Sequence, residues 1–118
     1  MKRILYVEDS EDTADAVKII LENQGYQVEI SSCGKDALIK AKEHFDLILL
    51  DIMLPDMSGW DIFEKLKKKD HVKFAFLSAI PVSNERMQEL KKAGVADYIT
   101  KPFEKEDLVK RVKKIIEL

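Results

Sequence analysis

The sequence of 118 residues has little of what defines several other protein classes. It contains one cysteine, Cys33, so no disulfide can form within the chain. Its longest aliphatic and aromatic runs, such as 4–7 and 47–50, are four residues long, far short of the roughly 20 that cross a bilayer. The first apolar stretch runs straight into Glu8 and Asp9, which argues against a secretory signal. These absences predict no membrane insertion and a location in the reducing cytoplasm.

What is present indicates one folded domain. Hydrophobic residues make up 46% of the chain, which excludes disorder, and no linker, repeat or low-complexity tract interrupts it. The formal net charge of −2 hides an asymmetry. Residues 1–64 hold 14 acidic and 6 basic side chains, whereas residues 65–118 hold 8 acidic and 14 basic ones. Solvated helix faces explain most of this asymmetry, but a few of the early acids need another explanation.

Short apolar runs alternate with amphipathic stretches along the whole chain. The apolar runs predict strands at 3–7, 28–30, 47–50, 74–77 and 96–100. Helical spacing predicts helices over 11–24, around 37–41, around 62–66, over 84–94 with Asn84 as N-cap, and over 104–117. The run at 47–50 is continuous rather than alternating, which indicates a central strand covered on both faces.

Five strands that alternate with five helices predict an α/β domain with a parallel sheet, because each parallel crossover needs a helix to return the chain. We expect a doubly wound, flavodoxin-like fold with strand order 2-1-3-4-5 and helices on both faces. In such sheets the site forms beyond the carboxyl ends of the strands, where the winding direction reverses.

Charged and hydroxyl side chains follow four of the predicted strands. Glu8 and Asp9 follow the first strand, Asp51 the third, Ser78 the fourth and Lys101 the fifth. If these strands are neighbours, three carboxylates, a hydroxyl and an ammonium share one pocket. Carboxylates that converge resist ionisation unless a positive charge compensates them, so the pattern predicts a bound cation.

The donor types favour Mg²⁺, with Mn²⁺ as a second candidate, because only oxygen ligands are offered. No cysteine or histidine stands among them to favour zinc, and His44 and His71 are predicted to lie on the surface. A cation and a lysine beside a spare carboxylate suit phosphoryl transfer, since a carboxylate can act as nucleophile and form an acyl phosphate.

Four motifs in this order resemble the receiver domain of two-component response regulators. They are ILYVED at 4–9, DIMLPDMSG at 51–59, LSA at 77–79 and DYITKPF at 97–103. The resemblance covers essentially the whole chain and extends to the single-domain regulators of chemotaxis and sporulation type. It implies that residues 1–118 are one receiver domain with no output domain in the chain.

The resemblance implies a role for each site residue. Asp51 would accept a phosphoryl group, and Glu8 and Asp9 would hold Mg²⁺ together with Asp51 and the backbone carbonyl of Met53. Lys101 would pair with the phosphoryl group. The protein would therefore be a signalling domain that catalyses its own phosphorylation and slow dephosphorylation rather than an enzyme acting on other substrates.

The resemblance also implies how the signal is transmitted. Ser78 and the N–H of Ala79 would receive phosphate oxygens, Tyr98 would be an aromatic switch that turns inward, and a cis peptide would precede Pro102. A sensor histidine kinase or phosphotransfer protein would be the donor. A downstream protein would bind the surface of the fourth helix, fifth strand and fifth helix, with no direct contact to nucleic acid.

Two apolar residues would flank the phosphoryl group in the geometry that the resemblance implies. They are Met53, two residues after Asp51, and Ile80, two residues after Ser78. Polar side chains there could position a hydrolytic water, so we expect slow dephosphorylation.

Several alternatives stay open at this point. Glu8 and Asp9 could cap the next helix, and Tyr98 could be a plain core residue. An aspartate-nucleophile phosphatase would usually carry a second acid where Met53 stands. A nucleic-acid binder could use the basic residues Lys105, Lys110, Arg111, Lys113 and Lys114, although acids interrupt them. The domain could also be a receiver cut from a longer regulator with an output domain.

Overall fold

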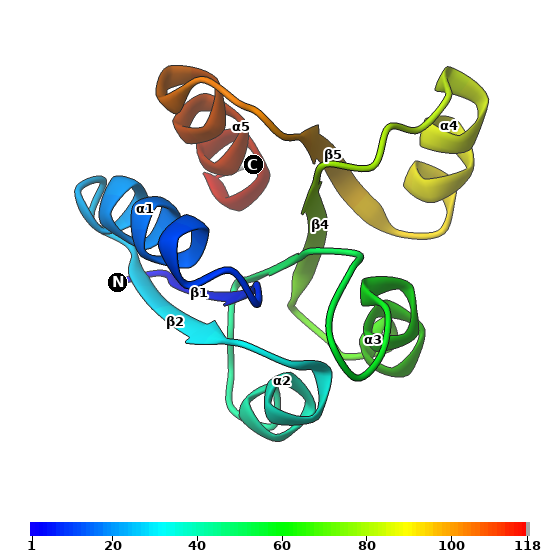
Figure 1. Ribbon diagram of the computed structural model, residues 1–118, viewed down its shortest axis with the longest axis horizontal. Coiled ribbons are helices and arrows are strands. Elements are labelled where there is room, and N and C mark those ends of the chain that lie inside the picture. The colour runs from blue at the N-terminus through cyan, green and yellow to red at the C-terminus, as the bar shows by residue number, and fades with distance from the viewer. Residues whose placement is uncertain (118) are drawn as a thin grey trace.

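Five parallel strands form the centre of the protein, in the order β2-β1-β3-β4-β5 (Figure 1). The structure is a computed structural model and describes residues 1–117. The strands are β1 (Arg3–Val7), β2 (Gln27–Ser31), β3 (Leu47–Leu50), β4 (Lys73–Ser78) and β5 (Val95–Thr100). The helices are α1 (Glu11–Glu22), α2 (Gly34–Lys40), α3 (Gly59–Leu66), α4 (Asn84–Lys92) and α5 (Lys105–Glu117). The predicted fold class and strand order are confirmed.

The sheet separates two hydrophobic cores. Helices α1 and α5 cover one face, and α2, α3 and α4 cover the other (Figure 1). Successive residues of β1 point to opposite faces, so Ile4 and Tyr6 pack toward α1 and α5 while Leu5 and Val7 pack toward α2 and α3. All four residues of β3 are fully buried, as a central strand between β1 and β4 requires.

The helix ends differ from the sequence prediction in detail. The prediction that Asn84 is the N-cap of α4 is wrong, because Ser83 has extended backbone and its hydroxyl accepts a hydrogen bond from the Arg86 N–H at 3.1 Å. Both residue types cap helices well, so the sequence could not decide between neighbours. Helix α1 ends at Glu22 rather than at residue 24, and Gly25 then turns the chain with a φ of 93°.

One close approach brings α3 to the carboxyl edge of the sheet. A Cβ atom at Gly59, the first residue of α3, would lie 2.1 Å from the backbone oxygen of Asp51. Glycine therefore allows α3 to begin directly beside the end of β3. Within residues 1–117, no helix is both long and apolar enough to cross a membrane.

Candidate functional site

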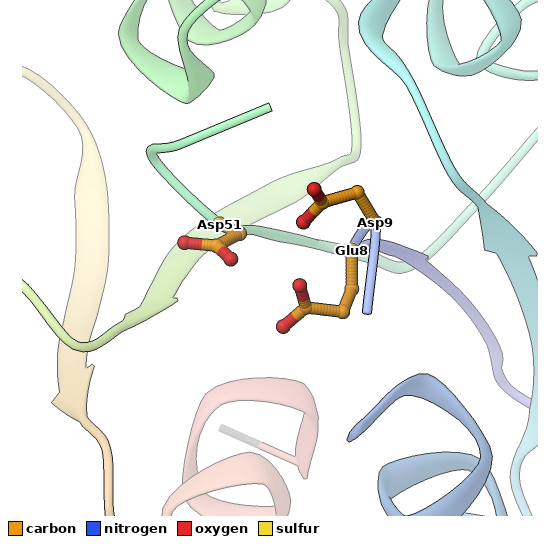
Figure 2. A group of neighbouring side chains, drawn as sticks. All are labelled: Glu8, Asp9 and Asp51. Atoms are coloured by element: carbon orange, nitrogen blue, oxygen red, sulfur yellow. The ribbon is translucent and has the colours of Figure 1, made fainter. Parts of the chain in front are cut away.

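Three carboxylates meet at the carboxyl edge of the sheet (Figure 2). Glu8 and Asp9 follow β1, Asp51 follows β3, and one oxygen of each lies within 4.8 Å of the others. The two strands are neighbours, and the N–H of Asp51 donates to the carbonyl of Val7 at 3.0 Å. The structure thus brings together the acids that the strand ends predicted. Glu8 and Asp51 are buried, whereas Asp9 is exposed.

Lys101 reaches this cluster from the end of β5. Its Nζ donates to the Glu8 carboxylate and lies 3.3 Å from Oδ2 of Asp51. Its backbone N–H donates to the carbonyl of Ser78 at 2.9 Å, which holds the two strand ends together. The peptide bond before Pro102 is cis, as the sequence analysis predicted. One ammonium group therefore serves two buried carboxylates, with a third carboxylate beside them.

Glu8 has two further partners that the sequence analysis missed. The Tyr6 hydroxyl donates to it at 3.0 Å, and the N–H of Ser10 donates at 3.2 Å. Burial works to raise the pKa of Glu8, but the bonds from Lys101 and Ser10 outweigh it and hold that pKa below its usual range. Burial and the Glu8 charge raise the pKa of Tyr6, which stays protonated as a donor. The sequence did contain a signal for the bond between Tyr6 and Glu8. Tyr6 places a hydroxyl in an otherwise aliphatic strand, on the same side of the strand as Glu8.

The pKa of Asp51 is shifted in the opposite direction from that of Glu8. Burial and the nearby Glu8 charge raise its pKa above the usual range, and Lys101 only partly offsets them. The cluster is therefore short of positive charge. The side-chain atoms that could bind a metal ion here are all carboxylate oxygens, which fit a hard divalent cation such as Mg²⁺. Met53 follows on the same loop, where it pairs with Ser58 in an isolated bridge.

The loop after β4 is connected to both Ser78 and Tyr98. Ser78 is buried, and its Oγ accepts a hydrogen bond from the N–H of Ile80 at 3.3 Å. The Tyr98 hydroxyl donates to the carbonyl of Ile80, so the ring lies inward and is 1% exposed. Burial raises the pKa of Tyr98. Ala79, whose N–H was predicted to bind phosphate, is exposed between these anchored residues.

An aromatic stack surrounds Tyr98 and was not predicted. The Tyr98 ring centroid lies 6.0 Å from that of Phe76 on β4 and 6.5 Å from that of Trp60 on α3. Trp60 and Phe76 are 4.3 Å apart, and the Arg86 guanidinium of α4 lies 5.1 Å from the Trp60 ring centroid. Any rotation of Tyr98 would therefore change the surroundings of Trp60.

The remaining candidate residues lie elsewhere. His44 and His71 are exposed and line a hollow at the amino end of the sheet, together with Asp46. Lys110 and Lys114 of α5 border a groove of about 480 Å³ beside β5, whereas Lys105 and Lys113 lie at a second hollow. Acids interrupt these lysines, since Asp97 and Asp107 lie in the same groove and pair with Arg111 at 3.2 and 3.8 Å. This mixture of charges disfavours a continuous nucleic-acid surface.

Comparison with known proteins identifies the family. Residues 4–113 match the family described as response regulator receiver domain. The chain is 36% identical over 117 residues to the response regulator SaeR of Staphylococcus epidermidis, and 37% identical over 118 residues to the transcriptional regulatory protein PcoR of Escherichia coli. These matches cover 98% of this chain but 51% and 52% of the relatives, so the chain spans about half of their length.

Solved structures show the same fold. A CheY-like receiver domain protein from Methanospirillum hungatei is 37% identical, with a TM-score of 0.88 over 99% of this chain and 94% of that one. The response regulator TrrA of Thermotoga maritima, solved in complex with Mg²⁺-BeF, is 31% identical, with a TM-score of 0.82 over 98% of this chain and 99% of that one. The chain belongs to the response regulator receiver domains, which are signalling domains of two-component systems.

Proposed function

We propose that Asp51 accepts a phosphoryl group from the phosphohistidine of a sensor histidine kinase or phosphotransfer protein, and that this phosphorylation switches the domain. The single observation that carries the proposal is the position of the Asp51 carboxylate. It lies in contact with Lys101 and among two further carboxylates at the carboxyl edge of the sheet. A buried nucleophile with a cation beside it is what phosphoryl transfer needs.

In the transfer step, one Asp51 carboxylate oxygen attacks the phosphorus atom of the phosphohistidine. A P–O bond forms, the P–N bond breaks, and its electron pair returns to the imidazole nitrogen of the donor. The product on this chain is an acyl phosphate. Lys101, which lies 3.3 Å from Asp51, would pair with the oxygens of the arriving group and reduce the charge repulsion.

We propose that Glu8, Asp9, Asp51 and the Met53 carbonyl hold a Mg²⁺ ion during this step. The raised pKa of Asp51 supports this assignment, because a further positive charge would favour the ionised carboxylate that must attack. The Mg²⁺-BeF complex of the related TrrA supports the choice of metal. When bound, the ion would neutralise charge on the phosphoryl oxygens.

The direct test is phosphorylation of purified protein by a small phosphodonor such as phosphoramidate, followed by mass spectrometry of the intact chain. We expect a gain of one phosphoryl group that requires Mg²⁺ and is absent from the Asp51→Ala variant. Asp70→Ala, which removes an exposed acid from the loop before β4, is the matched control and should label normally. Labelling of Asp51→Ala would refute the assignment.

We propose that Ser78, Ala79 and Tyr98 transmit the phosphorylation. The Ser78 hydroxyl and the Ala79 N–H would bind phosphoryl oxygens, which would shift the equilibrium of the loop after β4. Moving such an equilibrium from 1:99 to 99:1 needs about 5.5 kcal/mol of differential interaction. A few charge-assisted hydrogen bonds of roughly 1.5–3 kcal/mol each can supply it.

The stack around Tyr98 provides a measurement for this switch. Trp60 is the only tryptophan in the chain, and it lies beside Phe76 and Tyr98. We expect its fluorescence to change when Mg²⁺ and beryllofluoride, a phosphoryl mimic, are added. The change should shrink in Ser78→Ala and vanish in Asp51→Ala. An unchanged response in Ser78→Ala would remove Ser78 from the switch.

The partners follow from the family. Relatives named as response regulators support a sensor histidine kinase as the phosphoryl donor. We propose that the transfer takes place in the cytoplasm. We propose that a downstream protein reads the surface of α4, β5 and α5, because Tyr98 on β5 and the loop before α4 belong to it. If the domain works within a longer transcriptional regulator, as the name of PcoR suggests, the same surface would act on the attached part.

A further inference from the structure

The loop between β3 and α3, residues 51–58, is bound to α2 by a single carboxylate. Oδ1 of Asp56 accepts a hydrogen bond from the N–H of Gly34 at 2.8 Å, and Oδ2 accepts one from the N–H of Lys35 at 2.9 Å. These bonds join residues 22 and 21 positions apart. Both carboxylate oxygens are thus occupied, although Asp56 itself lies on the surface. The bond from Gly34 and then that from Lys35 lower the pKa of Asp56.

The neighbouring residue makes a second contact with the same helix. A Cβ atom at Gly34 would lie 2.3 Å from Cγ and 2.5 Å from Sδ of Met57, so the Met57 side chain packs directly against the glycine backbone. Gly34 is buried by this contact. Asp56 and Met57 together therefore fasten the loop to the beginning of α2 by two different kinds of interaction.

The rest of this loop is held at its two ends and by apolar packing. The N–H of Asp51 donates to the carbonyl of Val7 at 3.0 Å, and Ile52 and Leu54 pack into the core on the side of α2, α3 and α4. The N–H of Gly59 donates to the carbonyl of Ile52 at 2.8 Å, Met53 bridges to Ser58, and Ser58 caps α3. The contacts of Gly59, Met53 and Ser58 join the loop to itself or to α3. The loop begins with Asp51 and includes Met53, whose carbonyl we assign to the metal. The contacts of Asp56 and Met57 add a direct connection from the second half of this loop to the beginning of α2.

We propose that Asp56 is a positioning residue for the metal site: by fastening the 51–58 loop to α2, it holds Asp51 and the Met53 carbonyl in place for Mg²⁺. The inference rests on the function proposed above. Asp56 touches neither the ion nor the phosphoryl group in this proposal, and it acts through the loop. Replacing a residue that hydrogen-bonds directly to a metal ligand typically changes metal affinity by 10- to 100-fold, and we expect the lower end of that range for Asp56, which acts through the loop.

The first experiment titrates the phosphodonor-free protein with Mg²⁺ alone by isothermal calorimetry. We expect Asp56→Ala to weaken Mg²⁺ binding by about 10-fold. Asp56→Asn keeps one acceptor, the amide carbonyl oxygen, and should fall between that variant and the wild type. Asp36→Ala is the matched control, because Asp36 lies in the first turn of the same helix but bonds to Ser31 and Lys40 instead. It should bind Mg²⁺ as the wild type does.

A second set of variants tests the packing contact independently of any charge. Gly34→Ala places a methyl group against Met57 and should weaken Mg²⁺ binding. Met57→Ala makes room for that methyl group, so the double variant Gly34→Ala/Met57→Ala should bind more tightly than Gly34→Ala alone. Amide hydrogen exchange of metal-free protein adds a structural readout, since the N–H groups of Gly34 and Lys35 should exchange faster in Asp56→Ala.

The outcomes separate this inference from the proposed function. If the wild type binds Mg²⁺ and Asp56→Ala binds it equally well, Asp56 does not position the site. If Asp36→Ala weakens binding as much as Asp56→Ala does, the effect comes from α2 in general and the inference is wrong. If the wild type does not bind Mg²⁺, the proposed metal site fails and this inference fails with it. Should Asp56→Ala not fold, Asp56→Asn and the Gly34 and Met57 variants decide the question.

Discussion

The two ends of the sheet use the same residue types for different purposes. At the carboxyl end, Glu8 and Asp51 are buried and share Lys101. At the amino end, Arg3 pairs with Glu29 at 3.1 Å and with Glu43 at 3.2 Å, and these side chains are partly or largely exposed. Acids outnumber cations in both places, since Arg3 pairs with two acids at the amino end and Lys101 with two at the carboxyl end. Burial of the acids, rather than their presence or their number, distinguishes the candidate site from the surface.

The contrast is clearest for two aspartates. Asp46, at the amino end, receives the N–H of Arg3 at 2.8 Å, with His44 and Lys2 nearby. These partners outweigh its partial burial and hold its pKa below the usual range. Asp51 has a raised pKa, because its own burial and the Glu8 charge outweigh Lys101. The fold thus stabilises one aspartate as an anion and disfavours the anionic form of the other.

The largest difference between the two ends should appear when a lysine is replaced at each. We expect Lys101→Met to slow phosphorylation from a small phosphodonor by at least about 100-fold, because the cation beside the reacting group is lost. Lys2→Met, which removes a cation 3.9 Å from Asp46, should label at the wild-type rate. The measurement is the initial rate of acyl-phosphate formation. Equal rates for Lys101→Met and the wild type would contradict the role of Lys101.

A smaller effect should appear at the apolar residues that border the carboxyl end. Met53 is 69% exposed and Ile80 is partly buried. Both side chains are apolar, so neither offers a polar group to a hydrolytic water. We expect the double variant Met53→Asn/Ile80→Glu to lose its phosphoryl group about 10-fold faster than the wild type, which is less than the roughly 100-fold or more that a fully positioned general base supplies. Decay of the purified phosphoprotein measures this. Equal decay would show that these side chains do not set the lifetime.

The smallest effects should be on the free energy of unfolding, and substitutions of Asp51 and Asp46 should change it in opposite directions. Without divalent cations at neutral pH, Asp51→Asn should raise the free energy of unfolding by about 1 kcal/mol, because it removes an anion that the fold disfavours. Asp46→Asn should lower that free energy by about 1 kcal/mol, because it removes a charge-assisted hydrogen bond. Urea denaturation measures both. Two changes of the same sign would contradict the electrostatic contrast between Asp51 and Asp46.

The pH dependence provides a check on these signs. The folded pKa of Asp51 is raised, so its penalty to wild-type stability is relieved as the pH falls through that pKa. The advantage of Asp51→Asn should therefore shrink at acid pH. The folded pKa of Asp46 is depressed, so its contribution is present above the unfolded value and is lost as the pH falls through the folded pKa. The deficit of Asp46→Asn should also disappear, but at lower pH.

The sequence alone was sufficient for the fold and for the residues at the strand ends. Apolar runs and helical spacing are local patterns, so they predicted five strands, five helices and the acids that follow β1 and β3. The rule for parallel sheets then predicted the edge at which these residues meet. The cap of α4 was assigned one residue away from its true position, because Ser83 and Asn84 have nearly equal capping strength.

Only the tertiary structure decided which partners each side chain has. The bond from Tyr6 to Glu8, the contact of the Trp60 ring with Phe76 and the bonds that Asp56 accepts from α2 depend on where loops and helices pass. The direction of each pKa shift depends on burial and on charges that are distant in sequence, such as Lys101 beside Asp51. The spacing of apolar residues along the chain shows which residues face the core. The energies of hydrogen bonds and charge pairs depend instead on distances of a few ångströms between separate segments.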